Sequence, residues 1–498
     1  MRPASLRDRT AAGARAAILA RLWGAVAREP IPGVVRRRVD SSLLWVELSD
    51  GSVLTGDAAA ARPFAVTEPG FAVTLTSRTG VEVLAEPGDL IRAIAPVLGR
   101  HGARLADELD NSVANLALAR EAEPRTGDAD SLVHFEQSVV DGHPLHPCTR
   151  TRMGLSPDEV RAYAPEHHPV VMLRTIAVPP DRWYGSGRPL LVMHPWQHDR
   201  LCSTFPWLAT VEGELPARPL MSLRTLAIAP DRHVKTAMDV QMTSAVRTVS
   251  AASIHNGERL SRLMMDEQGR VPGLDALPES GGAILVDGEA DRRLAMTLRT
   301  VPVPAPGELV LPLAALAAPS AATGRPLVTE LDHDPLAVVT GLASALLPPV
   351  LAWLDLGVAL EAHGQNVLGV TTDGRFSRLL YRDFGGVRVS ARRLRERGIE
   401  PPPLLGDVPS DDPDVLRTKV LASAVATVLG EVIAVLTRHG LDEQQAWGRV
   451  AAVARGLPNA DGLFAETLPL KAMTAMRLAE HPTDDIWCAI PNPMAGLG

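Results

Sequence analysis

The sequence predicts an α+β fold in which strand-rich and helical stretches follow one another along the chain. Residues 169–330 consist of short apolar runs separated by Pro-Asp and Gly turns, a pattern typical of strands. Residues 88–121, and most of the chain from residue 336 onward, carry apolar side chains at the spacing that indicates amphipathic helices. Strands and helices therefore fall in separate parts of the sequence.

The chain has 498 residues, which is more than one ordinary hydrophobic core accommodates. The segment 121–130 is polar and contains Pro and Gly, as is typical of a linker. A second change of pattern, from strands to helices, falls near residue 335. These observations predict an N-terminal domain of residues 1–130, a strand-rich domain of residues 131–335 and a mostly helical domain of residues 336–498.

Within the N-terminal domain, the sequence predicts a helix, a small sheet and then further helices. Residues 1–29 have helical apolar spacing and are followed by Pro30 and Pro32, which end the helix. Turn signals separate short apolar runs between residues 34 and 79. Helical spacing returns in residues 88–121.

In the two later domains, the sequence predicts some elements clearly and others only in outline. A helix is predicted to begin near Ser131, whereas residues 258–330, rich in Gly, Pro and Ala, indicate only short strands and loops. Helices are also expected near residues 336–358, 413–439 and 470–480.

Composition and charge argue against several classes of protein. The net charge of −8 gives no electrostatic support for nucleic-acid binding. Cys148, Cys202 and Cys488 are scattered, so neither a disulfide framework nor a zinc or iron–sulfur site is expected. The Arg-rich N-terminus lacks the apolar centre of a secretory signal, and no run approaches the roughly 20 apolar residues of a membrane span. A cytoplasmic protein without membrane contact is expected.

A predicted hairpin gathers polar residues from both of its ends. Asp373-Gly374 is a strong hairpin-turn signal between two apolar runs. A hairpin brings its ends together, so Asp383 should lie close to the polar cluster that precedes the first run. That cluster consists of Glu361, His363, Gln365 and Asn366.

This hairpin would collect oxygen ligands of the kind that magnesium prefers. Glu361 and Asp383 supply carboxylates, and Gln365 and Asn366 supply amides. Mg²⁺ commonly shares such ligands with the phosphates of a nucleotide. The glycine pair after Phe384 would let the backbone approach a ligand closely. The alternative interpretation is a helix end followed by a surface hairpin whose charges face water.

Two histidines precede prolines in the segment 142–154. Each proline keeps the preceding His143 or His146 out of helical geometry. Arg150 and Arg152 follow at alternate positions, and imidazole together with guanidinium suits an anion such as phosphate. The alternative is an ordinary turn.

A further His-Pro pair occurs in His194-Pro195-Trp196-Gln197, at the end of an apolar run. Here we expect Trp196 to fill the core and Gln197 to satisfy its own hydrogen bonds. These two residues are therefore interpreted as structural.

Hydroxyl and guanidinium groups recur together in two blocks of the strand-rich stretch. If both blocks are strands, Ser222 and Arg224 share one face, and Thr243 and Arg247 share a face of the returning strand. Lys235 would lie on the loop between them. Such a hairpin face could hold a triphosphate and a carboxylate, which Arg binds bidentately. The alternative is a solvated face.

The common nucleotide and hydrolase motifs do not occur in the sequence. There is no G-x-x-x-x-G-K-[ST], no G-x-G-x-x-G after a strand and no G-x-S-x-G. Asp383-Phe384-Gly385 matches the magnesium-binding tripeptide of protein kinases, but the H-R-D and V-A-I-K motifs are missing.

Taken together, these blocks resemble the NRPS-independent siderophore synthetase family of the aerobactin-synthase type. The similar blocks are GHPLHPCTRTRMG, MHPWQ, MSLRT, TSAVRT, EAHGQN and RDFGG, which follow the family order over about residues 131–386. Arg150 stands where the family usually has Lys, and the tail after Gly386 is shorter than usual. The family's tail is sometimes likened to ferric reductases that hold an iron–sulfur cluster on four cysteines, but here only Cys488 lies in the tail.

The resemblance implies an ATP-dependent ligase with a cupped-hand fold of thumb, strand-rich fingers and helical palm. The enzyme would adenylate a carboxylate, typically citrate or a derivative, and release pyrophosphate. An amine or hydroxyl would then displace AMP, giving a siderophore or related metabolite. ATP and Mg²⁺ are the implied cofactors, and a homodimer is usual for the family.

The resemblance also implies a role for each matching residue. The catalytic residues would be Lys235, Arg247 and His363. The nucleotide would be held by His146, Arg150, Ser222, Arg224, Thr225, Lys235, Gln365 and Asp383. The carboxylate substrate would be held by Thr243, Arg247 and His363, with Lys471 reaching in from the tail. The metal would be held by Glu361, Asn366 and Asp383.

Two other functional classes stay open at this point. One is a kinase-like phosphotransferase, and the other is a non-catalytic small-molecule binding protein of the same fold. The sequence leaves open which carboxylic acid and which nucleophile are used.

Overall fold

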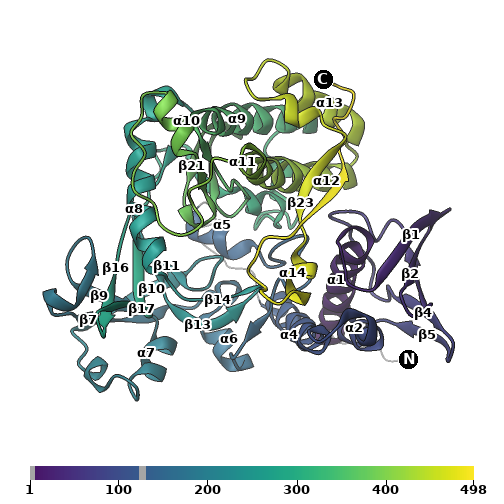
Figure 1. Cartoon of the computed structure of the whole chain (residues 1–498), viewed down its shortest axis with the longest axis horizontal. Coiled ribbons are helices and arrows are strands. Elements are labelled where there is room, and N and C mark those ends of the chain that lie inside the picture. The colour runs from purple at the N-terminus through teal and green to yellow at the C-terminus, as the bar shows by residue number, and fades with distance from the viewer. Residues whose placement is uncertain (1–5, 123–130) are drawn as a thin grey trace.

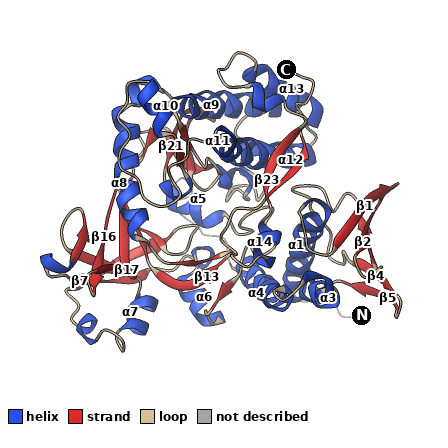
Figure 2. Cartoon of the chain, in the orientation of Figure 1, coloured by secondary structure: helices blue, strands red, loops and turns tan. Residues whose placement is uncertain are grey.

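The computed structural model of the chain describes residues 6–122 and 131–498. It has an N-terminal region, a strand-rich region and a mostly helical C-terminal region (Figure 1). Figure 2 shows strands gathered at the lower left and at the right edge of the molecule and helices gathered at the top, which confirms the predicted α+β class. The predicted linker at 121–130 falls largely outside the described residues.

The N-terminal region is a five-stranded antiparallel sheet with helices packed on it. Ile18, Leu22 and Trp23 of the first helix are fully buried, and so are alternate residues of the second strand such as Val46. The predicted helix–sheet–helix order is confirmed. The elements are α1 (Leu6–Arg28), β1 (Val34–Asp40), β2 (Leu43–Leu48), β3 (Val53–Asp57), β4 (Val73–Ser77), β5 (Gly80–Leu84), α2 (Pro87–Ala93), α3 (Ala95–Leu98) and α4 (Gly102–Glu121).

The strand-rich region contains an eight-stranded sheet of order β8-β16-β17-β12-β11-β10-β7-β9 and a smaller sheet of order β14-β13-β6. Its elements are α5 (Leu132–Ser138), β6 (Arg152–Met153), α6 (Pro157–Tyr163), β7 (Val171–Ala177), β8 (Trp183–Gly185), β9 (Leu190–Met193), α7 (Pro195–Leu201), β10 (Gly213–Pro219), β11 (Thr225–Ala229), β12 (Arg232–Thr236), β13 (Met238–Met242), β14 (Ala245–Arg247), α8 (Ala251–Asp266), β15 (Leu274–Ala276), β16 (Glu279–Val286), β17 (Glu289–Thr300), β18 (Glu308–Pro312) and the 3₁₀ turn η5 (Leu313–Ala317).

The prediction of only short strands and loops in residues 258–330 was wrong. Helix α8 enters this stretch, and strand β17 has 12 residues. The helix begins before residue 258, at the Ser250 cap, and buries Ile254 and Leu260 on one face. The residues that follow the helix are rich in Gly and Pro, and this composition obscures the helical pattern in the sequence.

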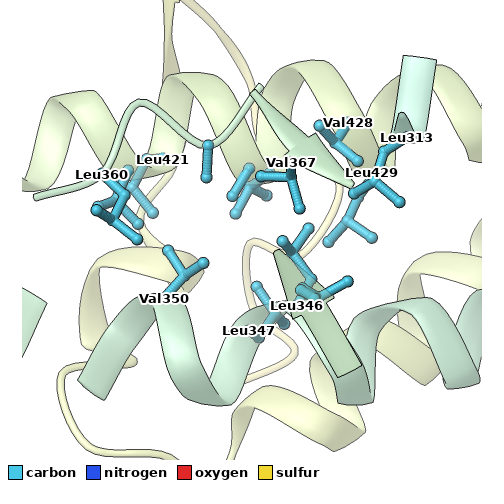
Figure 3. Packing of buried hydrophobic residues seen from close by; sticks show 14 of the residues in the cluster. Leu313, Leu346, Leu347, Val350, Leu360, Val367, Leu421, Val428 and Leu429 are labelled. Atoms are coloured by element: carbon cyan, nitrogen blue, oxygen red, sulfur yellow. The ribbon is translucent and has the colours of Figure 1, made fainter. Parts of the chain in front are cut away.

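The C-terminal region surrounds a small sheet of order β15-β21-β20-β18 with long helices. Its core is formed by α9, strand β20 and the middle of the long helix Pro413–Arg438 (Figure 3). The elements are α9 (Pro335–Leu356), β19 (Val358–Ala359), β20 (Val367–Thr372), β21 (Arg375–Tyr381), the 3₁₀ turn η7 (Phe384–Gly386), β22 (Arg388–Val389), α10 (Ala391–Glu396), α11 (Pro413–Val420), the π-helical segment η8 (Leu421–Leu429), α12 (Gly430–Arg438), α13 (Glu443–Ala454), β23 (Thr467–Lys471), α14 (Met473–Leu478) and β24 (Trp487–Pro491).

The end of the chain returns to the N-terminal region. Ala472, Ala475 and Leu478 belong to the same buried cluster as α1 and the first sheet. Figure 1 shows β23 leading down to α14, which lies beside α1. The helix predicted at 470–480 is shorter than expected, because Lys471 belongs to strand β23. The divisions at residues 130 and 335 stay predictions.

Two helices are long and apolar enough to cross a membrane, α9 and the continuous helix Pro413–Arg438. The sequence-based expectation that no stretch is apolar enough to span a membrane was therefore wrong for these two helices. Their most apolar windows are 56% and 83% buried inside the protein. Both helices supply the core shown in Figure 3.

Candidate functional site

One cleft of about 550 Å³ is lined by residues from many separated stretches of the chain. Every residue to which the sequence assigned a site role lies on its wall: His146, Arg150, Ser222, Arg224, Thr225, Lys235, Thr243, Arg247, Glu361, His363, Gln365, Asn366, Asp383 and Lys471. The sequence blocks therefore converge in space, whereas the individual roles stay predictions.

The histidines of the cleft share one local geometry. His143 Nδ1 accepts the backbone N–H of Leu145 at 3.2 Å, and His146 Nδ1 accepts that of Cys148 at 3.0 Å. His363 Nδ1 accepts the N–H two residues later at 3.3 Å. An imidazole nitrogen that accepts carries no proton, so in the neutral ring the proton lies on Nε2. Each ring therefore presents an Nε2–H donor.

These imidazoles are held neutral. Burial, with a contribution from His363, lowers the pKa of His143 to about 3. Burial also lowers the pKa of His146 well below its ordinary value, and lowers that of His363. The Nε2 of His146 lies 2.6 Å from the Oγ of Ser244, in the turn before β14, and this hydrogen bond fixes the orientation of the ring. The rings of His143 and His363 can thus donate hydrogen bonds to an anion without carrying a charge, whereas the Nε2–H of His146 is directed to Ser244.

The two arginines of the histidine loop do not both face an anion, as the sequence had suggested. Arg150 Nε donates to the Val140 carbonyl at 2.7 Å, so its guanidinium holds the loop while it lines the cleft. Arg152 forms a buried ion pair with Glu166 at 2.6 Å. Alternate spacing does not place them together because the chain forms turns up to Arg150 and strand β6 begins only at Arg152.

The prediction that Ser222 and Arg224 lie on a strand was also wrong. They belong to a turn before β11, in which Leu223 has a φ of 65°. Ser222 Oγ donates to Thr225 Oγ1 at 2.8 Å, and Arg224 donates to the carbonyl oxygens of Arg247 and Thr248, each at 2.9 Å. The turn nevertheless directs these side chains to the cleft.

Lys235 and the second hydroxyl–arginine block also differ from the predicted hairpin face. Lys235 lies within β12, paired with Thr225 of β11, rather than on a loop. Thr243 lies in the turn between β13 and β14 with a φ of 54°, and the guanidinium of Arg247 donates to its hydroxyl. The two blocks belong to different sheets, and a corner between the sheets brings them to one cleft.

The predicted hairpin of residues 361–386 is confirmed by the pairing of β20 with β21. Its closing end brings Arg382 against the start: the Arg382 N–H donates to the Asn366 carbonyl at 3.0 Å, and its Nε donates to the Gln365 carbonyl at 3.0 Å. Asp383 follows with a φ of 68°. Arg382 and Asp383, which follow the second strand of the hairpin, thus lie beside the polar cluster that precedes the first strand.

Asp383 connects the hairpin to the strand-rich region. Its carboxylate lies 2.6 Å from Lys235 Nζ, and its backbone N–H donates to Glu279 at 3.1 Å. Burial alone would raise the pKa of Asp383, but Lys235 and then Arg299 hold it well below its ordinary range. Asp383 is therefore a carboxylate at every ordinary pH.

Glu361 is held by lysines from the last part of the chain. Its carboxylate lies 3.6 Å from Lys419 Nζ and 3.9 Å from Lys471 Nζ, and both lysines also lie 2.7 Å from Asp485. Burial would raise the pKa of Glu361, but Lys419 and Lys471 lower it. A Cβ on Gly386 would overlap the Glu361 carboxylate, so a larger residue there would force the Glu361 side chain to move.

The described residues contain no group of three or more His, Cys, Asp or Glu side chains that could hold a metal alone. Among the carboxylates on the cleft wall, Glu361 and Asp383 each have a lysine partner. A metal bound there would therefore complete its shell with oxygens from a ligand, which is the usual situation for Mg²⁺.

Sequence reasoning missed several charged residues of the cleft. Glu136 and Arg382 form a buried ion pair, and Arg299 pairs with Glu279 at the edge of the cleft. Glu431 also lines the cleft, from the apolar middle part of the helix Pro413–Arg438. A charge inside so apolar a helix is a signal that could have found it. Asp485, which pairs with Lys471 of the cleft wall, was missed because it follows a segment without periodicity.

The interpretation of Trp196 and Gln197 as structural residues is confirmed. Trp196 is buried beneath the Arg200 guanidinium, and Gln197 accepts the Asp239 N–H at 2.8 Å. His194 accepts the Trp196 N–H at the start of α7 at 3.2 Å. These residues support the strands from outside the cleft.

Comparison with protein-family models gives two matches. The IucA / IucC family matches residues 131–189 and 184–318, and the family described as ferric iron reductase FhuF-like transporter matches residues 339–485. The second stretch contains no cysteine, so the chain lacks the thiolates of a four-cysteine iron–sulfur site.

Curated relatives match most of the chain at low identity. Staphyloferrin A synthase of Staphylococcus aureus is 26% identical over 435 residues, covering 73% of this chain and 73% of that protein. D-ornithine–citrate ligase of the same organism is 22% identical over 469 residues, covering 73% and 70%. The rhizobactin siderophore biosynthesis protein RhbC of Rhizobium meliloti is 26% identical over 526 residues, covering 85% and 88%.

Solved structures share the fold over the whole chain. The petrobactin biosynthesis protein AsbB from Bacillus anthracis superposes with a TM-score of 0.81 at 17% identity, covering 99% of both chains. ATP-bound aerobactin synthetase IucA from Klebsiella pneumoniae gives a TM-score of 0.74 at 19% identity, covering 97% of this chain and 99% of that chain. The ordered sequence blocks, the family matches and the shared fold lead to one conclusion: the chain belongs to the NRPS-independent siderophore synthetase family and is a ligase.

Proposed function

We propose that the protein is an ATP-dependent ligase that adenylates citrate or a citrate-like acid and joins it to an amine or hydroxyl nucleophile. Pyrophosphate and then AMP would be released, in the biosynthesis of a siderophore or related metabolite. The single observation that carries the proposal is the convergence of the cationic side chains and Asp383 in one cleft of about 550 Å³. A cleft of this size and charge suits a nucleotide together with a small polycarboxylate.

The nucleotide would lie against the strand-rich wall. Arg224 and Lys235 would supply donors for phosphate oxygens, and the Ser222 and Thr225 hydroxyls lie beside them. His146 would line this wall with its Nε2–H directed to Ser244. Burial lowers the pKa of Lys235, but the Asp383 carboxylate opposes that effect and keeps the ammonium paired. Arg150 would act mainly by holding the histidine loop. Gln365 would complete the nucleotide contacts from the hairpin.

The carboxylate substrate would lie between Arg247, Thr243 and His363. The Arg247 guanidinium is oriented by its contact with Thr243 and by a hydrogen bond to the Met242 carbonyl at 3.2 Å. Lys471 approaches the cleft from the tail and would balance further carboxylate charge. Orientation of two bound reactants and fixed donors at developing charge can supply much of a rate enhancement.

The donor chemistry of Glu361, Asn366 and Asp383 fits Mg²⁺ shared with nucleotide phosphates. When bound, the ion would neutralise charge on the phosphates as pyrophosphate leaves. Glu361 is oriented by Lys419, and the Asn366 side-chain amide donates to the Glu361 carbonyl at 3.2 Å. Lys235 would have to share Asp383 with the ion.

The test is incubation of the protein with ATP, Mg²⁺, hydroxylamine and a panel of carboxylates that includes citrate. The proposal expects a hydroxamate together with AMP and pyrophosphate in equal amounts. ADP as the product would favour a kinase-like phosphotransferase. Absence of turnover with every acid would favour a binding protein of the same fold. A cytoplasmic homodimer stays a prediction, which light scattering and cell fractionation can check.

A further inference from the structure

The cleft needs a way to receive a positively charged second substrate. A primary amine is largely an ammonium ion near neutral pH, and its nitrogen must lose a proton before it can attack a carbonyl carbon. Most of the charged side chains on the strand-rich wall are cations, such as Arg224, Lys235 and Arg247. An ammonium therefore needs a carboxylate partner elsewhere on the wall.

Four carboxylates line the cleft, and three of them already have cationic partners. Glu136 pairs with Arg382, Asp383 with Lys235, and Glu361 with Lys419 and Lys471. The fourth is Glu431. Within residues 6–122 and 131–498, its carboxylate has neither an ion pair within 4.0 Å nor a hydrogen bond.

The histidines cannot take the place of this carboxylate. His143, His146 and His363 each use Nδ1 to accept a backbone N–H, so the proton of each neutral ring lies on Nε2. They can orient an oxygen of the acid but cannot accept a proton at Nε2. Among the ionisable lining groups, Glu431 is left as the proton acceptor.

The local fold directs Glu431 to the wall of the cleft that the C-terminal residues also line. It follows the π-helical segment η8, where Thr427 Oγ1 donates five residues back to the Ala422 carbonyl at 2.7 Å. Such segments turn the following residues relative to an ordinary helix and are frequent at functional sites. Helix α12 also packs against η5, whose Ala314 N–H donates to the Gly364 carbonyl at 2.9 Å. Glu431 thus lies on the same side as the hairpin residue His363.

We propose that Glu431 receives the ammonium group of an amine nucleophile and takes the proton that its nitrogen must lose. This inference rests on the proposed function and makes the second substrate an amine rather than an alcohol. The carboxylate and R–NH₃⁺ become the carboxylic acid and R–NH₂. The nitrogen lone pair then attacks the acyl-adenylate carbonyl carbon, the carbon–oxygen bond to AMP breaks with its electron pair, and a second nitrogen proton leaves to water.

The charge environment of Glu431 agrees with this role. Burial raises its pKa to about 8, against the attraction of Arg21 and Arg438. In the empty cleft a carboxyl group with that pKa is largely protonated at neutral pH, but an ammonium bound beside it lowers the pKa and stabilises the carboxylate. The carboxylate can then take the proton from the amine and release it to water afterwards. Arg21 is kept from closing on it, since its Nε donates to the Pro144 carbonyl at 3.2 Å.

The test compares a charged and an uncharged nucleophile in the full-length protein. Rates of amide formation with 1,4-diaminobutane and of hydroxamate formation with hydroxylamine are measured with ATP, Mg²⁺ and the best acid. Hydroxylamine is largely uncharged at neutral pH and needs no carboxylate partner. For Glu431→Gln, we expect the ratio of diamine to hydroxylamine kcat/KM to fall tenfold or more. Glu443→Gln, a matched change on the exposed face of α13, should keep the wild-type ratio.

An unchanged ratio in Glu431→Gln, with hydroxamate still formed by the wild type, would overturn the role of Glu431 and leave the ligase intact. A wild type that forms no hydroxamate with any acid would overturn both. Glu431→Asp should recover part of the ratio, because it restores a carboxylate at a shorter reach.

Discussion

Lys235 and Asp383 are 148 residues apart in sequence and form a 2.6 Å ion pair on the wall of the cleft. Strand β12 carries the lysine, and the end of the β20–β21 hairpin carries the aspartate. The pair connects the strand-rich region to the helical region at the place where nucleotide and metal are proposed to bind. Both partners are therefore sensitive positions for activity.

Asp383→Asn should lower magnesium-dependent activity by on the order of a hundredfold, because the amide removes the charge that Lys235 and the metal share. The measurement is hydroxamate formation over a range of Mg²⁺ concentration. Unchanged activity and an unchanged metal response would mean that Asp383 does not act in the proposed way.

Arg247→Ala should abolish adenylation while the fold is kept. The guanidinium contacts only Thr243 and a carbonyl in the described residues, so its loss leaves no buried acid without a partner. Citrate-dependent AMP release and the circular-dichroism melting curve are measured together. Arg62→Ala, an exposed change in the N-terminal region, serves as the control. Retained AMP release in Arg247→Ala would remove this residue from the site.

Gly386→Ala should be far more damaging than Gly385→Ala. A Cβ at residue 386 would overlap the Glu361 carboxylate, whereas at residue 385 its nearest neighbour is an oxygen of Asp383 at 3.6 Å. We expect the first change to cost about 1–3 kcal/mol of unfolding free energy and most of the activity. Urea unfolding and hydroxamate assays check this, and equal effects of the two changes would contradict the packing at Glu361.

Glu431→Gln should make the protein more stable at pH 8 than the wild type, with a smaller difference at pH 5. The folded-state pKa of Glu431 is about 8 and lies above its unfolded value. The unfolded chain then loses this proton at lower pH than the folded chain, so the wild type loses stability as pH rises between the two values. Thermal midpoints at both pH values measure it. A midpoint that falls equally at both pH values would contradict the burial of this carboxyl.

The sequence predicted the residues of the site better than their local structure. The blocks around His146, Arg224, Arg247 and Asp383 were found because their chemistry is concentrated in short motifs, and the Asp373-Gly374 turn located the hairpin. The strand-parity argument failed for Ser222 because a turn with positive φ at Leu223 replaces the strand.

Residues that act from other elements could not be read from motifs. Glu431 lines the cleft from one long helix, and Lys419 of the same helix contacts the lining residue Glu361. Asp485 contacts the lining residue Lys471 through the return of the tail. Such contacts have large sequence separations and no local pattern. Only the presence of charges within an apolar helix pointed toward them.

The central claim is that the cleft transfers AMP to a carboxylate. The most direct test uses citrate, or the best acid of the panel, with its carboxylate oxygens isotopically labelled, together with ATP and hydroxylamine. Mass spectrometry of the products should find one heavy oxygen in AMP, because the labelled oxygen attacks the α-phosphorus and stays there when the nucleophile displaces AMP. Heavy oxygen in inorganic phosphate together with ADP, or AMP without label, would contradict the account.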